Sequence, residues 1–479
     1  MTSKIQRIFH KTIGTITKIK RRLKIFKPTI RRNLKEIIIT PLLFLTALAT
    51  RTYMLDKFPY FPKEWPYLGD KPGPPGLYGD EAFYLSLAKR IPERLPAYQP
   101  WLQLILIKLS ILTLGESAFS ARLPSAIFGS LNTILIYLIV RKLYKDWKAA
   151  TISALFYIAM TPALIYNRMV FLENGVSFFL LLTLYTALKY DETNNDNWLL
   201  ASITSSVLAT YCKINGLATV VYLIIHLLQR NKKKKALAAA FLASIPILAF
   251  IITSYALRIE YFQGMEKATK SFRRQWWIGL IGKEMSLYQY MIIPSLPSGV
   301  LLQLISGYIP LEYWYLFTYF TIIYIYIHKP KETQPIATAI ISFLATMIMV
   351  WGAGSYYLTI IQPLLAATTG PAILGMKKMT PIQTLLLTLL IYTPLITTII
   401  ATLPSERPKI SIDYQRYQLK IILLGIPLLI NILNTTPIIK KKHIPAIITT
   451  TLTLIALITG SYITNTLYPH YFNVIPQKP

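Results

Sequence analysis

Two adjacent carboxylates, Asp80 and Glu81, stand out because acidic residues are scarce in this sequence: it holds 20 Asp and Glu against 51 Lys and Arg. They follow the first long apolar run, within Gly-Leu-Tyr-Gly-Asp-Glu-Ala-Phe-Tyr at 76–84. General acid or base catalysis needs ionisable groups of this kind beside the reacting atoms. A solvated loop also carries carboxylates for no catalytic reason, so their meaning depends on the elements that position them.

The composition predicts a polytopic α-helical membrane protein. Of the 479 residues, 53% are hydrophobic, and the mean hydropathy is +0.44. Apolar runs recur from Ile37 almost to the end, many of them near the roughly 20 residues that span a bilayer core as a helix. The alternating segments of about 10 residues that indicate a membrane β-barrel are absent from the sequence. We therefore expect an all-α fold with about 13 transmembrane helices.

The net charge of +31 does not indicate nucleic-acid binding. The basic residues collect in short runs between apolar segments, which is the pattern that membrane topology and anionic lipid headgroups produce. Cys212 is the only cysteine, so disulfides and Cys-based metal sites within the chain are excluded. The expected partners at this level are membrane lipids, with no nucleic acid.

The basic runs also orient the chain. By the positive-inside rule they place the N-terminus in the cytoplasm and the C-terminus outside. Residues 1–36 form a basic cytoplasmic segment, either an amphipathic helix on the inner leaflet or a solvated tail. The other expected segments are a first transmembrane helix at 37–55, a first outer loop at 56–121, helices 2–7 at 122–257, a second long outer loop at 258–309, helices 8–13 at 310–466 and an outer tail at 467–479.

The first outer loop positions the acidic pair. Several prolines between residues 59 and 75 stiffen the approach to Asp80. Residues 80–91 predict a short helix with Asp80 at its start, a position that Asp favours. Residues 101–114 predict a second helix that lies along the outer interface without crossing the membrane. Farther on, we expect a third span over about 149–166 and an outer hairpin at 167–174.

Cations gather on the same outer face as the two acids. Arg122 begins the second span, Arg168 and Glu173 lie in the outer hairpin, and Lys213 ends the fifth span. Arginine suits phosphate because its planar fork makes two hydrogen bonds at once. Snorkelling toward lipid phosphate is the alternative for each residue alone. The second outer loop adds Arg258, Lys267, Lys270, Arg273 and Arg274, and the whole set predicts a transferase acting on a lipid-linked phosphate donor.

Four motifs in order carry a family resemblance. They are Gly-Asp-Glu-Ala-Phe-Tyr at 79–84, Gly-Glu-Ser-Ala-Phe-Ser-Ala-Arg-Leu-Pro-Ser at 115–125, Asn-Arg-Met-Val-Phe-Leu-Glu-Asn at 167–174 and Lys-Ile-Asn-Gly at 213–216. In this order and at these spacings the chain resembles the GT-C glycosyltransferases. The protein O-mannosyltransferase and lipid A aminoarabinose transferase group is the branch it resembles most. Ser-Tyr-Tyr with a following Gln-Pro, at 355–363, resembles the later aromatic and proline motif of that family.

The resemblance implies a polyprenyl (dolichyl)-phosphate sugar donor at the outer membrane face. It implies an inverting transfer to a protein, lipid or glycan acceptor. Asp80 matches the catalytic acidic residue, expected to act as the base, and Glu81 matches its neighbour. Lys213 matches a basic position near the donor phosphate. The candidate substrate-binding residues are Tyr84, Arg122, Arg168, Glu173, Lys213, Arg258, Lys267, Arg273, Arg274, Tyr356 and Tyr357.

Some motifs are missing. Trp276 and Trp277 are not followed by Asp-Tyr-Gly, so the oligosaccharyltransferase motif is absent. Without an Asp-x-Asp motif or a His-rich cluster, we expect no cofactor and catalysis independent of a metal.

The main alternative is a multi-span lipid or solute transporter or flippase, whose charges would line a pathway near mid-membrane. The named charges lie near span ends instead, which favours an interfacial enzyme. A non-catalytic scaffold would leave the outer carboxylates unexplained.

Overall fold

The computed structural model describes residues 36–57, 77, 79–93, 100–256, 312–350 and 355–375. Over these residues the chain is helical and contains no strand, which confirms the all-α class. A first helix covers residues 36–52. The later elements are α2 (Gly79–Arg90), α3 (Leu102–Leu114), α4 (Ala118–Tyr144), α5 (Trp147–Ala159), α6 (Thr161–Tyr166), α7 (Glu173–Thr193), α8 (Asp196–Cys212), η1 (Ile214–Gly216), α9 (Leu217–Gln229), α10 (Lys233–Ala256), α14 (Glu312–His328), α15 (Pro330–Val350), η4 (Ser355–Ile360) and α16 (Gln362–Gly375).

Two of the described helices are long and apolar enough to cross a bilayer by themselves. They are Ala118–Tyr144 and Lys233–Thr253, each above the roughly 20 residues that a hydrocarbon core requires. The second long outer loop at 258–309 and the last expected spans, beyond residue 375, lie outside the described residues. The count of about 13 spans therefore stays a prediction, as do the orientation of the termini and the interfacial placement of α2 and α3.

The long helix α4 forms because its two ends are well terminated. At its start, Ser117 accepts a hydrogen bond from the backbone N–H of Ser120, and the Ser120 hydroxyl accepts one from the N–H of Ser117. This reciprocal capping satisfies backbone donors that a helix start leaves unpaired. At the other end, Arg141 and Lys142 lie in the last turn, where cations interact favourably with the negative end of the helix dipole. Since α4 begins at Ala118, Arg122 lies one turn inside the helix.

The third expected span, 149–166, is not one continuous helix. The helix α5 ends at Ala159, Met160 is extended (φ −62°, ψ 110°), and α6 begins at Thr161. Pro162 explains the break, because proline lacks a backbone N–H and its ring clashes with the carbonyl four residues earlier inside a helix. Proline is accommodated in a first turn, which is its place in α6. The break delivers the chain into the hairpin that carries Arg168.

Three clusters of buried residues hold the described helices together, and two of them bear on the site. The central core takes residues from the first helix and from α4, α5, α6, α7, α8, α9, α14, α15, η4 and α16. Gly370 of α16 packs closely against α5 in this core, since an added Cβ would lie 1.9 Å from the carbonyl oxygen of Ala149. The second core joins α2 and α3 to the hairpin between α6 and α7, through residues such as Leu85, Leu104 and Val170. This second core is what holds the acidic helix α2 in place.

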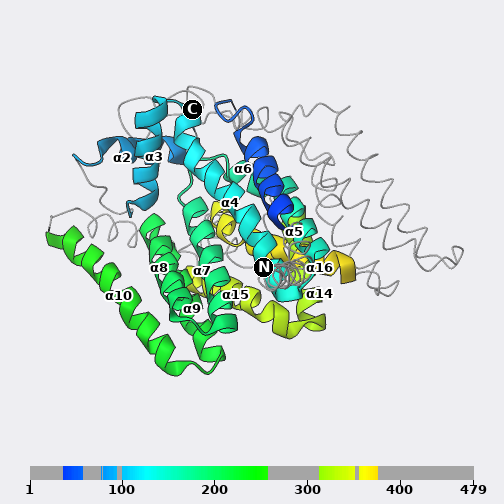
Figure 1. Cartoon of the computed structure of the whole chain (residues 1–479). Coiled ribbons are helices and arrows are strands. Elements are labelled where there is room, and N and C mark those ends of the chain that lie inside the picture. Colours follow the sequence, from blue (N-terminus) through cyan, green and yellow to red (C-terminus); the bar gives the residue numbers. More distant parts are fainter. Residues whose placement is uncertain are drawn as a thin grey trace, which may run out of the picture.

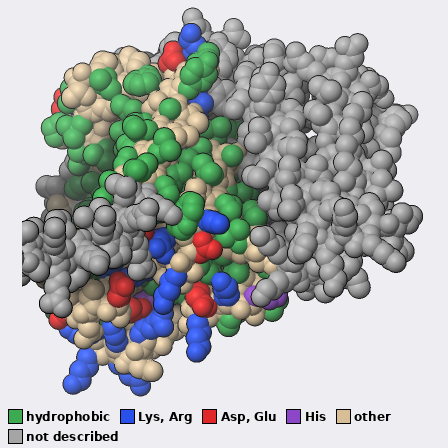
Figure 2. All heavy atoms as spheres, turned by 45° about the vertical axis from the view of Figure 1, so that its right-hand side comes forward, with side chains coloured by type: hydrophobic (Ala, Val, Ile, Leu, Met, Phe, Trp, Pro, Cys, Tyr) green, Lys and Arg blue, Asp and Glu red, His purple; other side chains and the backbone are tan. Residues whose placement is uncertain are grey.

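The two ends of the helix bundle differ in character. The helices α2 and α3 lie at one end, and the turn between α9 and α10 lies at the opposite end (Figure 1). Figure 2 shows hydrophobic side chains over the upper part of one face and Lys, Arg, Asp and Glu gathered near its lower end. The ion pairs Lys142–Glu192, Arg230–Asp191 and Lys235–Asp196 belong to this charged end. The charged end is the one that the positive-inside rule predicts to be cytoplasmic.

Candidate functional site

The helix α2 carries both residues of the acidic pair. Asp80 lies in its first turn, a position that the positive end of the helix dipole favours for a carboxylate, and the side chain of Asp80 lies outside the described part. Tyr84 follows four residues later, so Asp80 and Tyr84 occupy the same face of α2. Tyr84, Leu85 and Ala88 of α2 are buried in the second core.

Glu81 is paired with Arg122 inside the protein. Arg122 Nε and one of its terminal nitrogens donate to the two carboxylate oxygens of Glu81, both at 2.8 Å, and both side chains are fully buried. The backbone N–H of Val170 also donates to Glu81, at 3.0 Å. Such two-pronged pairing fixes geometry as well as adding energy. Glu81 thus fastens α2 to α4 and to the hairpin.

Arg168 and Arg51 join the hairpin after α6 to the end of the first helix. Arg168 donates to the carbonyl oxygens of Tyr53 and Met54, at 2.6 and 3.1 Å. Arg51 is fully buried and donates to Asn167 Oδ1 at 3.1 Å. Burial, followed by the nearby charges of Arg122 and Arg51, lowers the pKa of Arg168 to about 10. Arg168 is still charged at neutral pH, in a place where an anion would be stabilised.

Lys213 is the centre of the contacts that join the remaining candidates. Its ammonium forms a buried ion pair with Glu173 and donates to Tyr84 Oη at 3.3 Å. It also lies over the ring of Tyr357, 4.7 Å from the ring centroid, in a cation–π arrangement. Four predicted site residues from α2, α7, the end of α8 and η4 therefore meet at one point.

Buried amide side chains hold the hairpin between α6 and α7 in place. Asn167 donates to Asn174 Oδ1 at 2.7 Å, and Asn174 donates to the carbonyl oxygen of Tyr166 at 2.9 Å. Gln103 of α3 donates to the carbonyl oxygen of Phe171 at 2.8 Å and accepts from the N–H of Gly175 at 3.0 Å. The sequence analysis missed Gln103 and Arg51. A single polar residue in or beside an apolar run gives no local sign that its side chain is buried and hydrogen-bonded.

The described side chains of this region include more buried cations than buried carboxylates. Among the described side chains, Arg51, Arg122, Arg168 and Lys213 are buried, whereas Glu81 and Glu173 are the buried carboxylates of this region. Backbone carbonyl oxygens and aromatic rings also contact these cations.

The other candidates are not placed by the structure. Arg258, Lys267, Arg273 and Arg274 lie outside the described residues, and for Tyr356 only the backbone, in η4, is described. Within the described ranges, no group of three or more His, Cys, Asp or Glu side chains could hold a metal ion.

Comparison with known proteins bears on this geometry. Residues 96–255 match the family model described as dolichyl-phosphate-mannose-protein mannosyltransferase. The fold is similar to the crystal structure of ArnT from Cupriavidus metallidurans bound to undecaprenyl phosphate, with TM-score 0.50, 13% identity, and coverage of 93% of this chain and 78% of that one. The resemblance to the GT-C glycosyltransferases is confirmed.

A second GT-C structure has the same fold. It is the arabinosyltransferase EmbB from Mycobacterium smegmatis, with TM-score 0.53, 10% identity and coverage of 91% of this chain. The match spans 40% of the EmbB chain. A comparison with curated proteins finds no match. At these identities the likeness is one of fold, and the family match covers α3 to α10, with Arg122, Arg168, Glu173 and Lys213 but without α2.

Proposed function

We propose that this chain is a membrane glycosyltransferase that moves a sugar from a polyprenyl (dolichyl)-phosphate donor to an acceptor at the extracytoplasmic face. The observation that carries the proposal is the contact of Lys213 with Glu173, Tyr84 and Tyr357. It holds a cation against the helix that bears Asp80. The mannosyltransferase family match and the GT-C fold support the same reaction class.

Asp80 is the base in this proposal. Its carboxylate accepts the proton of the acceptor hydroxyl while that oxygen attacks the anomeric carbon. The bond between the anomeric carbon and the phosphate oxygen breaks, and polyprenyl phosphate leaves with the bonding electrons. Attack from the side opposite the leaving group inverts the anomeric centre.

Lys213 and the arginines serve the leaving group. The phosphate gains negative charge as the sugar departs, so preorganised cations lower the barrier more than an acid would. The residue types of the buried cations, three arginines and a lysine, suit a phosphate ligand. The undecaprenyl phosphate bound to ArnT supports a polyprenyl phosphate as that ligand. A membrane anchor also positions the donor without a deep soluble pocket.

Glu81 acts on the site through α2. Both of its oxygens bind Arg122, and one also accepts from Val170, inside the protein. We therefore assign Glu81 as a positioning residue that fixes the first turn of α2, in which Asp80 lies. This refines the sequence-based hypothesis, which placed Glu81 beside Asp80 as a catalytic candidate.

A reconstituted transfer assay tests the function against the transporter alternative. The purified full chain in liposomes would receive dolichyl-phosphate sugars labelled in the sugar, with membrane protein and lipid extracts as acceptors. The proposal expects label covalently attached to an acceptor and release of dolichyl phosphate. Label that crosses the bilayer while still attached to its lipid would overturn the proposal and support a flippase.

A further inference from the structure

Asn215 is a buried polar residue near Lys213 that the proposed reaction leaves unused. Its side chain is 3% exposed, and neither its amide nitrogen nor its amide oxygen has a hydrogen-bond partner in the described structure. A buried amide without partners destabilises a folded protein, and each such group calls for an explanation. Asn215 lies two residues after Lys213, in the short turn η1 between α8 and α9.

The turn that carries Asn215 is held rigidly. The backbone N–H of Gly216 donates to the carbonyl oxygen of Lys213 at 2.8 Å, and that of Lys213 donates to Ala209 at 3.2 Å. Gly216 is pressed against α8, since an added Cβ would lie 2.1 Å from the carbonyl oxygen of Ala209. The position of the amide therefore follows from the packing of α8 and α9, and it is preorganised.

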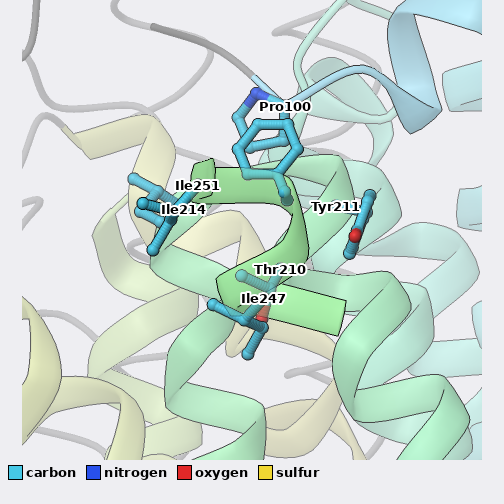
Figure 3. Close-up of a pocket in the computed structure, with 7 residues that line it drawn as sticks. Pro100, Thr210, Tyr211, Ile214, Ile247 and Ile251 are labelled. Carbon is cyan, nitrogen blue, oxygen red and sulfur yellow. The ribbon is translucent and has the colours of Figure 1, made fainter. Parts of the chain in front are cut away.

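The position of Ile214 indicates that Asn215 does not face α10. Ile214 lines a small apolar crevice with Ile247 and Ile251 of α10, with a cavity volume of about 10 Å³ (Figure 3). Successive residues of a 3₁₀ turn point about 120° apart, and Asn215 is not among the lining residues. One and two turns later, Thr219 and Tyr222 continue its face of α9, and both of their side chains are buried.

The chemistry of the amide indicates its ligand. Asparagine has both donors and an acceptor. An ionised phosphate diester only accepts hydrogen bonds, so it would leave the amide oxygen without a partner. A sugar hydroxyl both donates and accepts, and two neighbouring hydroxyls satisfy both ends of the amide.

We propose that Asn215 is a binding residue for the sugar of the donor, hydrogen-bonding its hydroxyl groups while Lys213 serves the phosphate. The inference rests on the proposed function and goes beyond it, because it assigns a determinant of which sugar is accepted. A site built to hydrogen-bond a hydroxyl discriminates strongly against a sugar that lacks it or presents it differently.

The test uses Asn215→Leu, which keeps the volume and removes both polar atoms. The full chain would be assayed with dolichyl-phosphate mannose, glucose and arabinose, and its binding of sugar-free dolichyl phosphate would be measured separately. We expect the KM of the preferred donor to rise about 10- to 100-fold, because two neutral hydrogen bonds are lost. The differences in KM among the three sugars should become smaller. Binding of dolichyl phosphate should be unchanged.

Thermal stability separates binding from a structural role. Replacing a buried amide without partners by an apolar group should leave the Tm unchanged or raise it. The matched control is Tyr222→Phe, which removes a buried hydroxyl about 10 Å farther along α9. Like the Asn215 amide, this hydroxyl has no partner in the described structure. The control should leave sugar preference unchanged.

Three results would overturn the assignment. An unchanged KM in Asn215→Leu means that the amide binds water or nothing. A lower Tm with weaker binding of dolichyl phosphate means a structural role, and Asn215→Ala would then show the same loss. If the wild-type chain transfers no sugar, the proposed function is contradicted together with the role of Asn215. The first two results contradict only the role of Asn215.

Discussion

Tyr84 and Lys213 are 129 residues apart in the chain, and the Lys213 ammonium donates to Tyr84 Oη at 3.3 Å. This bond ties α2 to the turn between α8 and α9. Asp80 lies one turn before Tyr84 on α2, so the contact fixes the helix that carries the proposed base. Glu173 and Tyr357 complete the surroundings of the Lys213 ammonium.

Loss of Lys213 should reduce stability and transfer through separable effects. Lys213→Met leaves the carboxylate of Glu173 buried without its counterion, which typically costs about 3–5 kcal/mol of folding free energy. Adding Glu173→Gln should recover most of the stability, because the buried charge is then gone. Transfer should stay low in both variants, as measured by donor KM and kcat after a Tm determination. Full transfer in the double variant would show that Lys213 does not contact the donor.

Loss of Glu81 should act mainly through folding. Glu81→Gln breaks the two-pronged pair with Arg122, and we expect a loss of about 3–5 kcal/mol in unfolding free energy. The double variant Glu81→Leu with Arg122→Met replaces the pair by apolar groups and should recover stability. Calorimetry or denaturant unfolding of the purified chain provides the measurement. A Glu81→Gln protein with wild-type stability but no transfer would make Glu81 a direct participant instead.

The charged end of the bundle should set part of the acid stability. Burial opposes ionisation of Asp191, but the hydrogen bond with His226 and the charges of His226, Arg230 and Lys232 outweigh it, so the pKa of Asp191 is lowered. Its stabilising contribution is complete above the ordinary value of 3.8 and is lost as the pH falls through the lowered folded pKa.

The expected result is a wild-type Tm that falls below pH 4 more steeply than that of Asp191→Asn. At neutral pH Asp191→Asn should be the less stable protein, with unchanged donor KM, because the residue lies at the end opposite α2. Parallel Tm profiles of the two proteins would show that the ion pairs of Asp191 contribute nothing to folding.

Metal removal tests another expectation. The sequence lacks the motifs of a tightly held metal, so transfer should be unchanged after prolonged treatment with EDTA. The control is the same assay with added Mg²⁺ or Mn²⁺. Activity that is lost with EDTA and restored by one of these ions would contradict metal-independent catalysis.

The sequence predicted the helices of the site better than their contacts. The short helix after the prolines is present as α2, and the second apolar helix as α3, because capping and apolar run length are local signals. The break after Ala159 was missed although Pro162 marks it, since the apolar run continues across the proline. The pairing of Glu81 with Arg122 could not be predicted, because a contact across 41 residues depends on how α2 packs on α4.

The same limit applies to the cations. Charge and topology placed Arg122, Arg168 and Lys213 at one face, but only the structure distinguishes their partners. Arg122 binds a carboxylate, Arg168 binds the carbonyls that end the first helix, and Lys213 joins the face of α2 that carries Tyr84. Asn215 lies in the motif Lys-Ile-Asn-Gly, but the sequence does not show that its amide is buried without a hydrogen-bond partner in the described structure.

The most direct test of the central claim is transfer by Asp80→Asn. The variant keeps the shape of the side chain and removes its basicity. It would be compared with wild type and with Asp196→Asn, an exposed and ion-paired control at the opposite end, using dolichyl-phosphate sugars and proteins of equal Tm. Loss of a general base typically costs about 10²–10⁴-fold, so kcat should fall by that factor with donor binding retained. Transfer at the wild-type rate in a folded Asp80→Asn protein would contradict the account.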